Sequence, residues 1–356
     1  MFAITQVTGF VAEHPTWTRL TEALAILATL WWAWVSYAWL GNTAGSDDGA
    51  LRVVLLGAMG PLLVLSLAVP GAFAGDGLIF GVAYAVVRGL HLTGYAVLAR
   101  HDRQLRGVVA RLASTVVPAS LLLVLAGALD GRARALCWLA ALAIDYGGLA
   151  VRGTEGWRVE PAHFAERHAG IIIIALGESI ISVGAGAGQL ELGARVIVAA
   201  LLGTTAAAAL WWAYFDVVAL AGERRMRALP FAAQTRIARD SYTYLHLPMV
   251  AGIVLFALGV KESLPADAHR LPEVVAVALY GGVALYLVAL SAFKRRNYGS
   301  FNRPRLVAAT LLAVLAPVAS AMPPLLALAL VAAIAAALVA YEATRYAEAR
   351  ERIRHA

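Results

Sequence analysis

Apolar segments of about 20 residues recur along nearly the whole chain, and short polar or basic stretches separate them. A helix needs roughly 20 mostly apolar residues to cross a hydrocarbon core of ~30 Å, so each of these segments is long enough to span a membrane. The pattern predicts eleven complete spans, at residues 20–41, 51–73, 78–99, 107–129, 133–151, 165–187, 194–221, 242–260, 272–293, 305–321 and 324–343.

The first twelve residues form a shorter apolar stretch that contains the polar residues Thr5, Gln6 and Thr8. At ~1.5 Å of rise per residue this stretch is too short to cross a bilayer. It lacks a basic n-region, which excludes a signal peptide. We therefore expect the second half of a further helix. The predicted fold is an all-α, polytopic transmembrane helical bundle of about 12 spans with the first one truncated.

The composition fits a membrane-embedded chain, because 61% of the 356 residues are hydrophobic and only 14% are charged. A water-soluble surface cannot be assembled from so few charges. The net charge of +7 resides mainly in short loops between spans, where anionic lipid headgroups explain it better than nucleic acid does. The single cysteine, Cys137, lies in an apolar span, which excludes an intramolecular disulfide or a thiolate metal site. The expected partner is the lipid bilayer.

The basic residues are concentrated in alternate loops, near residues 100–111, 152–167, 224–239 and 294–305, and in the tail at 345–354. Cytoplasmic loops of membrane proteins carry an excess of Lys and Arg. This parity predicts that these loops and both termini face the cytoplasm of a cell membrane. One cytoplasmic loop, residues 42–48, departs from the pattern because it is acidic.

The two halves of the chain resemble each other. LWWAW at residues 30–34 matches LWWAY at 210–214, and Gln6 falls near Glu178. Six spans in each half return the chain to the same side, which predicts two parallel repeats in one membrane domain. The repeats would cover residues 1–155 and residues 156–356, the second with a short cytoplasmic tail. The shared alanine-rich and leucine-rich composition of the helices is an alternative explanation.

Ionisable side chains in or next to the spans are the candidate functional residues. Such groups are costly in a bilayer and usually face a bundle interior, a partner or a water-filled path. The candidates for a substrate or ion pathway are Arg88, His91, Asp145, His163, Glu166, Arg167, Glu178, Asp216 and His246.

Helical rise sorts these residues by depth. Arg88 and Glu178 both lie about 18–20 Å from the cytoplasmic end of their helices. This common depth predicts a buried ion pair with His91 one turn away. A second layer about 10 Å deep, which the polar residues that open the seventh span can reach, consists of Asp145, Asp216 and His246.

Each candidate also has a plainer structural explanation. A pair of Arg88 and Glu178 would simply lock two helices together. His246 would hydrogen-bond backbone that the following Pro248 leaves free, and Asp216 would be a helix-end residue near the cytoplasm. His163 and Glu166 have the spacing of a carboxylate–histidine dimetal motif, but the second copy is missing and we expect no metal.

Several segments, in order along the chain, resemble the bacterial low temperature requirement A (LtrA) family. They are FAITQ at 2–6, WWAW at 31–34, YAVVRGLH at 84–91, HFAERHAGIIIIALGESII at 163–181, WWAYFD at 211–216 and YTYLHLPMVAGIVLFALG at 242–259. The resemblance covers essentially the whole chain and implies a multipass membrane protein whose family name refers to a cold-growth phenotype, with no defined biochemical activity. The acidic-aromatic run, similar to ELFFDLVFVF, that usually begins the family's first helix is missing here.

The leading functional hypothesis is a secondary transporter or permease of ions or small solutes, because two similar halves enclose ionisable groups at mid-membrane depth. One alternative is an ion channel with two six-helix repeats. Another is a non-transporting membrane protein for cold or stress adaptation. We expect no enzyme, since no nucleophile–base–orienter set is present, and no cofactor. The substrate, the coupling ion and the oligomeric state do not follow from the sequence.

Overall fold

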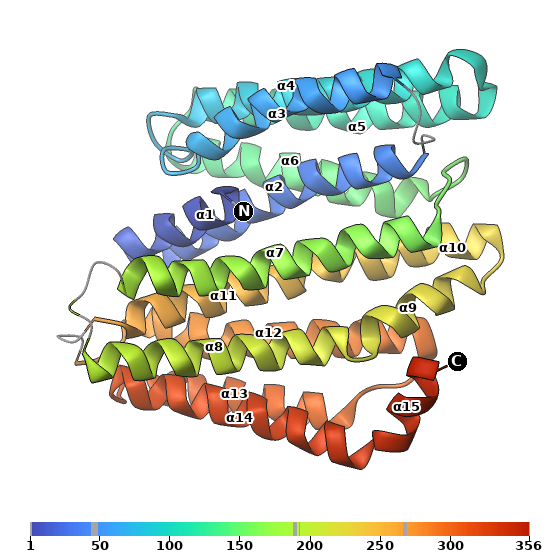
Figure 1. Cartoon of the computed structure of the whole chain (residues 1–356). Helices are drawn as coiled ribbons and strands as arrows, with labels where there is room; N and C mark the ends of the chain where they lie inside the picture. The colour runs from blue at the N-terminus through green and yellow to red at the C-terminus, as the bar shows by residue number, and fades with distance from the viewer. Residues whose placement is uncertain (1, 44–48, 188–190, 192, 266–268, 356) are drawn as a thin grey trace.

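In the computed structural model, helices lie side by side and run back and forth along one common direction (Figure 1). The structure describes residues 2–43, 49–187, 191, 193–265 and 269–355. Every regular element within these ranges is helical. The all-α prediction is confirmed for the part of the chain that the structure describes.

The elements of the first half are α1 Phe2–Glu13, α2 Trp17–Thr43, α3 Gly49–Leu67, α4 Gly77–Leu98, the 3-10 turn η1 Ala99–His101, α5 Arg103–Gly127 and α6 Gly131–Arg152. The elements of the second half are α7 Pro161–Ala187, α8 Ala194–Phe215, α9 Val218–Arg227, α10 Phe231–Ile237, the π-helix η2 Ala238–Tyr244, α11 His246–Ser263, α12 Glu273–Tyr298, α13 Arg303–Ala319, α14 Pro324–Arg345 and α15 Ala347–His355.

Each of the eleven predicted spans contains a helix, although α3 ends at Leu67, before the predicted end of the span at 51–73. Among the described residues, eight helical stretches are long and apolar enough to cross a membrane. They are α2, α4, α5, α6, α12 and α14, together with Ala194–Arg227, which joins α8 and α9, and Phe231–Ser263, which joins α10, η2 and α11. Leu51–Leu67, in α3, is a shorter apolar helix.

Two predicted spans are less regular than expected. The span at 194–221 is interrupted, because α8 ends at Phe215 and α9 begins at Val218. The span at 242–260 is α-helical only from His246, since η2 precedes it. A π-helical segment is rare and often occurs at functional sites. Apolar residues continue on both sides of the break after Phe215, so hydropathy could not reveal it, and hydropathy does not distinguish a π-helix from an α-helix.

Four helix contacts of the first half have counterparts in the second half. In the first half, α3 packs on α4, α4 on α5, α5 on α6, and α2 on α6. In the second half, α11 packs on α12, α12 on α13, α13 on α14, and α8 on α14. The order of these helix contacts along the chain is therefore the same in both halves.

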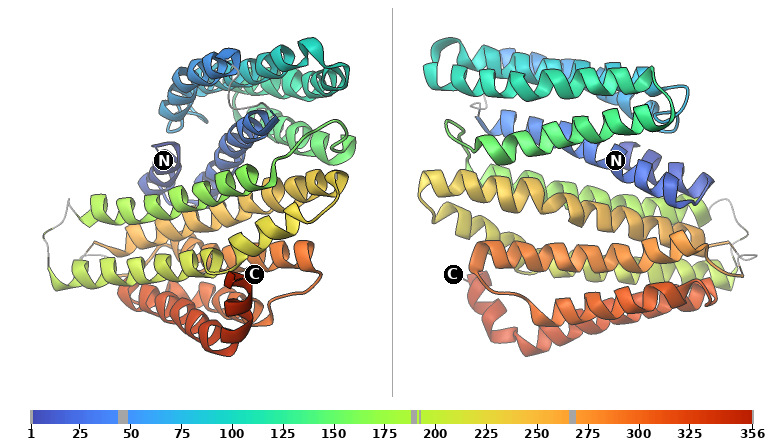
Figure 2. Two further views of the ribbon diagram at one scale, coloured as in Figure 1. Left: turned by 45° about the vertical axis from the view of Figure 1, so that its right-hand side comes forward. Right: turned by 180° about the vertical axis from the view of Figure 1, so that it is seen from behind.

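The basic connections lie at one end of the bundle, on the right in Figure 1 and on the left in the rear view of Figure 2. They join α4 to α5, α6 to α7, α8 to α11, and α12 to α13. The C-terminal helix α15 lies at the same end. This arrangement agrees with the alternation of basic loops along the sequence.

Helix α2 joins the two halves through its tryptophans. The indole Nε1 of Trp31 donates a 2.9 Å hydrogen bond to the backbone oxygen of Thr243 on η2. Nε1 of Trp39 donates a 2.9 Å hydrogen bond to the hydroxyl Oγ1 of the same residue. Tyr244 donates from its hydroxyl to the backbone oxygen of Tyr146 on α6 at 2.6 Å. These bonds hold η2 against the helices that surround the site described next.

Candidate functional site

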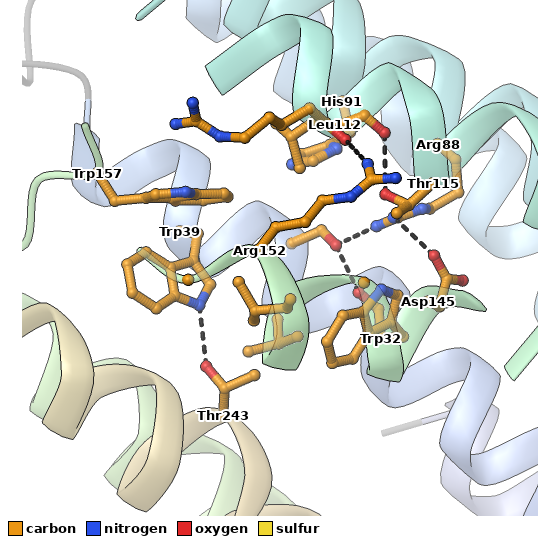
Figure 3. Close-up of a pocket in the computed structure, with 16 residues that line it drawn as sticks. Trp32, Trp39, Arg88, His91, Leu112, Thr115, Asp145, Arg152, Trp157 and Thr243 are labelled. Carbon is orange, nitrogen blue, oxygen red and sulfur yellow. Dashed lines mark hydrogen bonds and ion pairs between the residues drawn. The ribbon is translucent and has the colours of Figure 1, made fainter. Parts of the chain in front are cut away.

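A cavity lies between α2, α4, α5 and α6, and Thr243 of η2 lines one side of it (Figure 3). Its volume is about 50 Å³. A buried water molecule needs about 10–15 Å³ of such volume, so the cavity has room for a few waters or one small solute. The helices around it approach closely, since a Cβ on Gly148 of α6 would lie 2.4 Å from Cγ2 of Thr115 on α5.

A buried ion pair forms one wall of the cavity. Nη2 of Arg88 on α4 lies 3.2 Å from Oδ1 of Asp145 on α6, and the two residues are only 1% and 3% exposed. The hydroxyl of Tyr84 donates a 2.5 Å hydrogen bond to Oδ2 of Asp145. Nη1 of Arg88 donates to the hydroxyl of Ser36 on α2. Three helices therefore meet at Arg88.

His91 lies one helical turn beyond Arg88 and is 1% exposed. Its ring packs between Tyr37 and Tyr95, at centroid distances of 5.7 and 5.2 Å. Within the part of the chain that the structure describes, neither ring nitrogen has a partner at hydrogen-bond geometry, although the backbone of Ser36 lies close. The Nε of Arg88 also lacks a partner there.

Two further arginines form the rim at the basic end. Nη2 of Arg111 on α5 donates to the backbone oxygen of Glu155 at 2.6 Å. Nη1 of Arg152 donates to the backbone oxygen of Arg111 at 2.8 Å and to the hydroxyl of Ser114. Figure 3 shows the side chain of Arg152 extending across the cavity towards Thr115. Neither rim arginine forms an ion pair with a carboxylate that the structure describes.

The predicted pairing of Arg88 with Glu178 is wrong, because the carboxylate within reach of Arg88 is that of Asp145. Glu178 is buried in α7 and does not line the cavity. Helical rise had assigned Arg88 and Asp145 to different depths. The long side chain of Arg88 bridges this difference in depth. Helix α5 packs on both α4 and α6, which brings Asp145 within reach of Arg88.

The predicted second layer is also dispersed. Asp216 is the C-cap residue of α8, and its carboxylate binds Arg350 and Arg354 of α15. The hydrogen bonds to Asp216 raise the pKa of the Arg350 guanidinium. Asp216 is therefore a helix-end residue that holds the C-terminal helix, as the plainer explanation expected. Of the second layer, only Asp145 reaches the cavity.

His246 belongs to a separate aromatic cluster in the second half. Its Nε2 lies 2.8 Å from the hydroxyl of Tyr214, and its Nδ1 lies 3.0 Å from the backbone oxygen of Ser241 in η2. The ring of His168 on α7 lies 5.1 Å from that of His246. Bonding of His246 to a backbone carbonyl agrees with the structural explanation, but the carbonyl belongs to the π-helical turn.

The polar residues that open α7 do not reach the cavity. The side chains of His163 and Glu166 are 74% and 82% exposed, and Nδ1 of His163 lies 3.8 Å from Oε2 of Glu166. The guanidinium of Arg167 lies against Gly41 of α2, where an added Cβ would be 2.9 Å from Nη2. Among the described residues, no group of three His, Cys, Asp or Glu side chains is arranged to hold a metal ion.

Sequence reasoning did not select several residues at this site, among them Tyr84, which binds Asp145, and four polar residues that line the cavity. Tyr84 lies four residues before Arg88 on the same helix face, so YAVVRGLH carried a usable signal. The positive-inside rule accounts for Arg111 and Arg152 as loop residues and gives no hint of a cavity. Ser36 and Thr243 gave no signal, because their roles depend on helices that are distant in sequence.

Comparison with known proteins gives one family. The sequence model of a family described as bacterial low temperature requirement A protein (LtrA) matches residues 1–340. The uncharacterized protein RA0937 of Rhizobium meliloti (strain 1021) is 28% identical to this chain over 311 residues, which cover 83% of this chain and 74% of that protein. No solved structure matches the chain.

Proposed function

The chain belongs to the bacterial low temperature requirement A (LtrA) family, and we propose that it is a multipass cell-membrane protein that acts as a secondary transporter or permease of ions or small solutes. The observation that carries this proposal is the cavity around Arg88 and Asp145, a charged site enclosed by apolar helices. On this proposal the chain moves its substrate unchanged and has no catalytic role.

Charged residues are costly inside a membrane-spanning bundle. An arginine or aspartate at the centre of a membrane helix costs about 2.5–3.5 kcal/mol on insertion scales. Arg88 and Asp145 are both almost fully buried between helices of apolar composition. A site that holds two such groups beside a water-sized space is typical of a substrate path.

A purely structural role for this pair is less consistent with its geometry. Arg305 on α13 and Glu342 on α14 form a lock of that kind, with Nε and Nη2 of the arginine 2.8 and 2.7 Å from the two carboxylate oxygens. Bidentate pairs of this type are the strong ones. Arg88 makes a single, longer contact with Asp145, whose other oxygen is bonded to Tyr84. The Arg88 pair therefore keeps donors available for a solute.

The position of the cavity also supports transport. Secondary transporters often consist of two repeats and bind substrate near the repeat interface, beside irregular helices. Four helix contacts follow the same order in both halves. The π-helix η2 of the second half reaches the cavity of the first half through Thr243. We therefore retain the proposal of about 12 spans in two parallel six-helix repeats, with the basic end and the C-terminus in the cytoplasm.

Flux through proteoliposomes tests the proposal. Full-length protein would be reconstituted and assayed with a panel of ions and small solutes, with and without an imposed proton or sodium gradient. At least one solute should enter faster than into protein-free vesicles. Asp145→Asn should slow that entry by about tenfold, the effect of losing ~1.4 kcal/mol of interaction.

The second buried pair supplies the matched control. Glu342→Gln also breaks a buried arginine–carboxylate pair, but Glu342 does not line the cavity. This variant should retain most of the flux when it is reconstituted at equal amount and elutes as a single species. If no ion or solute enters faster than into protein-free vesicles, the transport proposal is wrong.

A further inference from the structure

We infer that the cavity around Arg88 is an anion-binding site, and that its ligand is a small anion in the size range of nitrate or formate. This inference names the substrate class of the proposed transporter and rests on that proposal for the step across the membrane. The binding itself is argued from charge, unused hydrogen-bond donors, size and access.

The cavity carries a surplus of positive charge. Its charged lining residues are the three arginines Arg88, Arg111 and Arg152 and the one carboxylate of Asp145. With His91 neutral, these groups leave a formal charge of +2. Asp145 is already engaged by Arg88 and Tyr84, and the rim arginines contact only backbone oxygens and a serine hydroxyl. A bound monovalent anion would reduce this charge to +1, whereas a cation would add to the repulsion.

The cavity also contains unused donors. The Nε of Arg88 and both ring nitrogens of His91 are buried and have no hydrogen-bond partner among the described residues. Arginine has only donors, and a neutral histidine always has one N–H. Leaving a buried donor unsatisfied costs about 1–3 kcal/mol. Because Arg88 and His91 lie one turn apart on α4, one acceptor between them can accept from Nε of Arg88 and from the single N–H of a neutral His91.

Size limits the anion. The volume of about 50 Å³ accommodates an ion of a few heavy atoms. Trp32, Trp39 and Trp157 also line the cavity, and the rings of Trp39 and Trp157 pack edge to face at 4.9 Å. A sugar acid such as gluconate is too large to enter without separating these rings.

Access is from the basic end of the bundle. Arg152 is exposed and extends over the cavity, so its guanidinium meets an entering ion before Arg88 does. A cleft lined by charge of one sign raises the local concentration of the opposite ion. Arg152 is therefore expected to act in capture and Arg88 in binding.

Binding is tested on the purified full-length protein in detergent. The thermal midpoint would be measured while sodium gluconate is replaced by sodium nitrate or sodium formate at constant ionic strength. A saturable rise of the midpoint is expected, because a ligand that binds only the folded state stabilises it. Arg88→Gln and Arg152→Gln should raise the concentration for half-saturation by about tenfold, the loss expected for one charge-assisted hydrogen bond.

Arg345→Gln is the matched control, since it removes the same charge from an exposed position at the end of α14. It should leave the half-saturation unchanged. Arg152→Gln keeps the test informative if Arg88→Gln does not fold, because Arg152 is exposed at the rim. A midpoint that does not respond to nitrate and formate, or that responds equally in wild type and Arg152→Gln, overturns the inference.

The outcome separates this inference from the proposed function. Saturable nitrate binding without flux of any solute would leave the anion site standing and remove the transport proposal. Flux of a cation or neutral solute by a protein whose midpoint ignores both anions would remove the anion site and leave transport standing.

Discussion

Asp216, at the C-terminal end of α8, accepts a 2.8 Å hydrogen bond from Nη2 of Arg350, which lies 134 residues later in α15. Nε of Arg350 donates to the other carboxylate oxygen, and Arg354 adds a contact to the first. The side chains of Asp216 and Arg350 are 8% and 13% exposed. This forked contact attaches the C-terminal helix to the bundle.

We predict that Asp216→Asn loosens α15. The variant removes the charge and one acceptor from a contact that excludes most water, at a cost of about 1–3 kcal/mol. Limited trypsin digestion in detergent should then cleave after the arginines of α15 at least about fivefold faster, the effect of ~1 kcal/mol. Mass spectrometry of the released peptides measures the rate.

Glu348→Gln is the control for this prediction, because Glu348 is an exposed carboxylate of α15 itself. It should not change the cleavage rate. High salt should reproduce part of the Asp216→Asn effect, since it screens an ion pair at the bundle surface. Equal cleavage rates in wild type and Asp216→Asn would show that other contacts hold the helix.

The two buried arginine–carboxylate pairs should differ in coupling energy. A double-mutant cycle with Arg88→Gln and Asp145→Asn should give about 1 kcal/mol, within the range measured for interactions inside membranes. The cycle with Arg305→Gln and Glu342→Gln should give about 2 kcal/mol, because that pair is bidentate and shorter. Unfolding in mixed micelles of mild detergent and dodecyl sulphate measures both. A larger coupling for Arg88 and Asp145 would favour a structural role for that pair.

The sequence predicted the helical segments well, because one physical quantity decides them. A run of about 20 apolar residues must be helical in a bilayer to satisfy its backbone, and each of the eleven predicted spans contains a helix. The π-helix before His246 and the break after Phe215 escaped this reasoning. Both depend on local hydrogen bonding, which hydropathy does not report.

The candidate site was predicted in its chemistry and missed in its pairing. The cost of buried charge selected Arg88, His91 and Asp145, which all line the cavity, and their role in a substrate path stays a prediction. Helical rise then paired Arg88 with Glu178, because depth along a helix ignores which helices are neighbours. Asp145 lies beside Arg88 because α5 packs on both α4 and α6. Ser36 and Thr243 enter the site for the same reason.

Glu160 is predicted to make stability depend on pH at the start of α7. Its carboxylate accepts hydrogen bonds from the backbone N–H groups of His163 at 2.7 Å and Ala162 at 3.2 Å. The bond from His163 is the main cause that lowers the pKa of Glu160 below its ordinary value of 4.5. A lowered folded-state pKa means that the stabilisation is complete above about pH 4.5 and is lost as the pH falls through the folded-state value.

The variant Glu160→Ala should therefore be less stable than wild type at pH 7, by about 0.5–1 kcal/mol for a half-exposed capping residue. The difference between the two proteins should shrink as the pH falls below about 4.5 and through the lowered pKa of Glu160 in the folded protein, because the carboxylate then becomes protonated in both states. Glu166→Gln, six residues further along α7, is the control, because no described backbone N–H donates to that carboxylate. A difference that stays constant down to pH 3 would contradict the assignment.

The proposed orientation makes a prediction for intact cells. If the basic end faces the cytoplasm, residues between α4 and α5 are protected from an impermeant thiol reagent, and residues at the start of α6 are labelled. Cys137 would first be replaced by alanine to give a cysteine-free background. Gln104→Cys and Ala133→Cys then mark the two ends, since both residues are exposed and uncharged. Ala133→Cys should react in intact cells, and Gln104→Cys only after permeabilisation.

The charge bias behind this expectation is strong, because the basic connections and α15 all lie at the end that carries Gln104. The reverse labelling pattern would show that the cavity entrance faces the outside of the cell. The rim arginines would then bind anions from the medium.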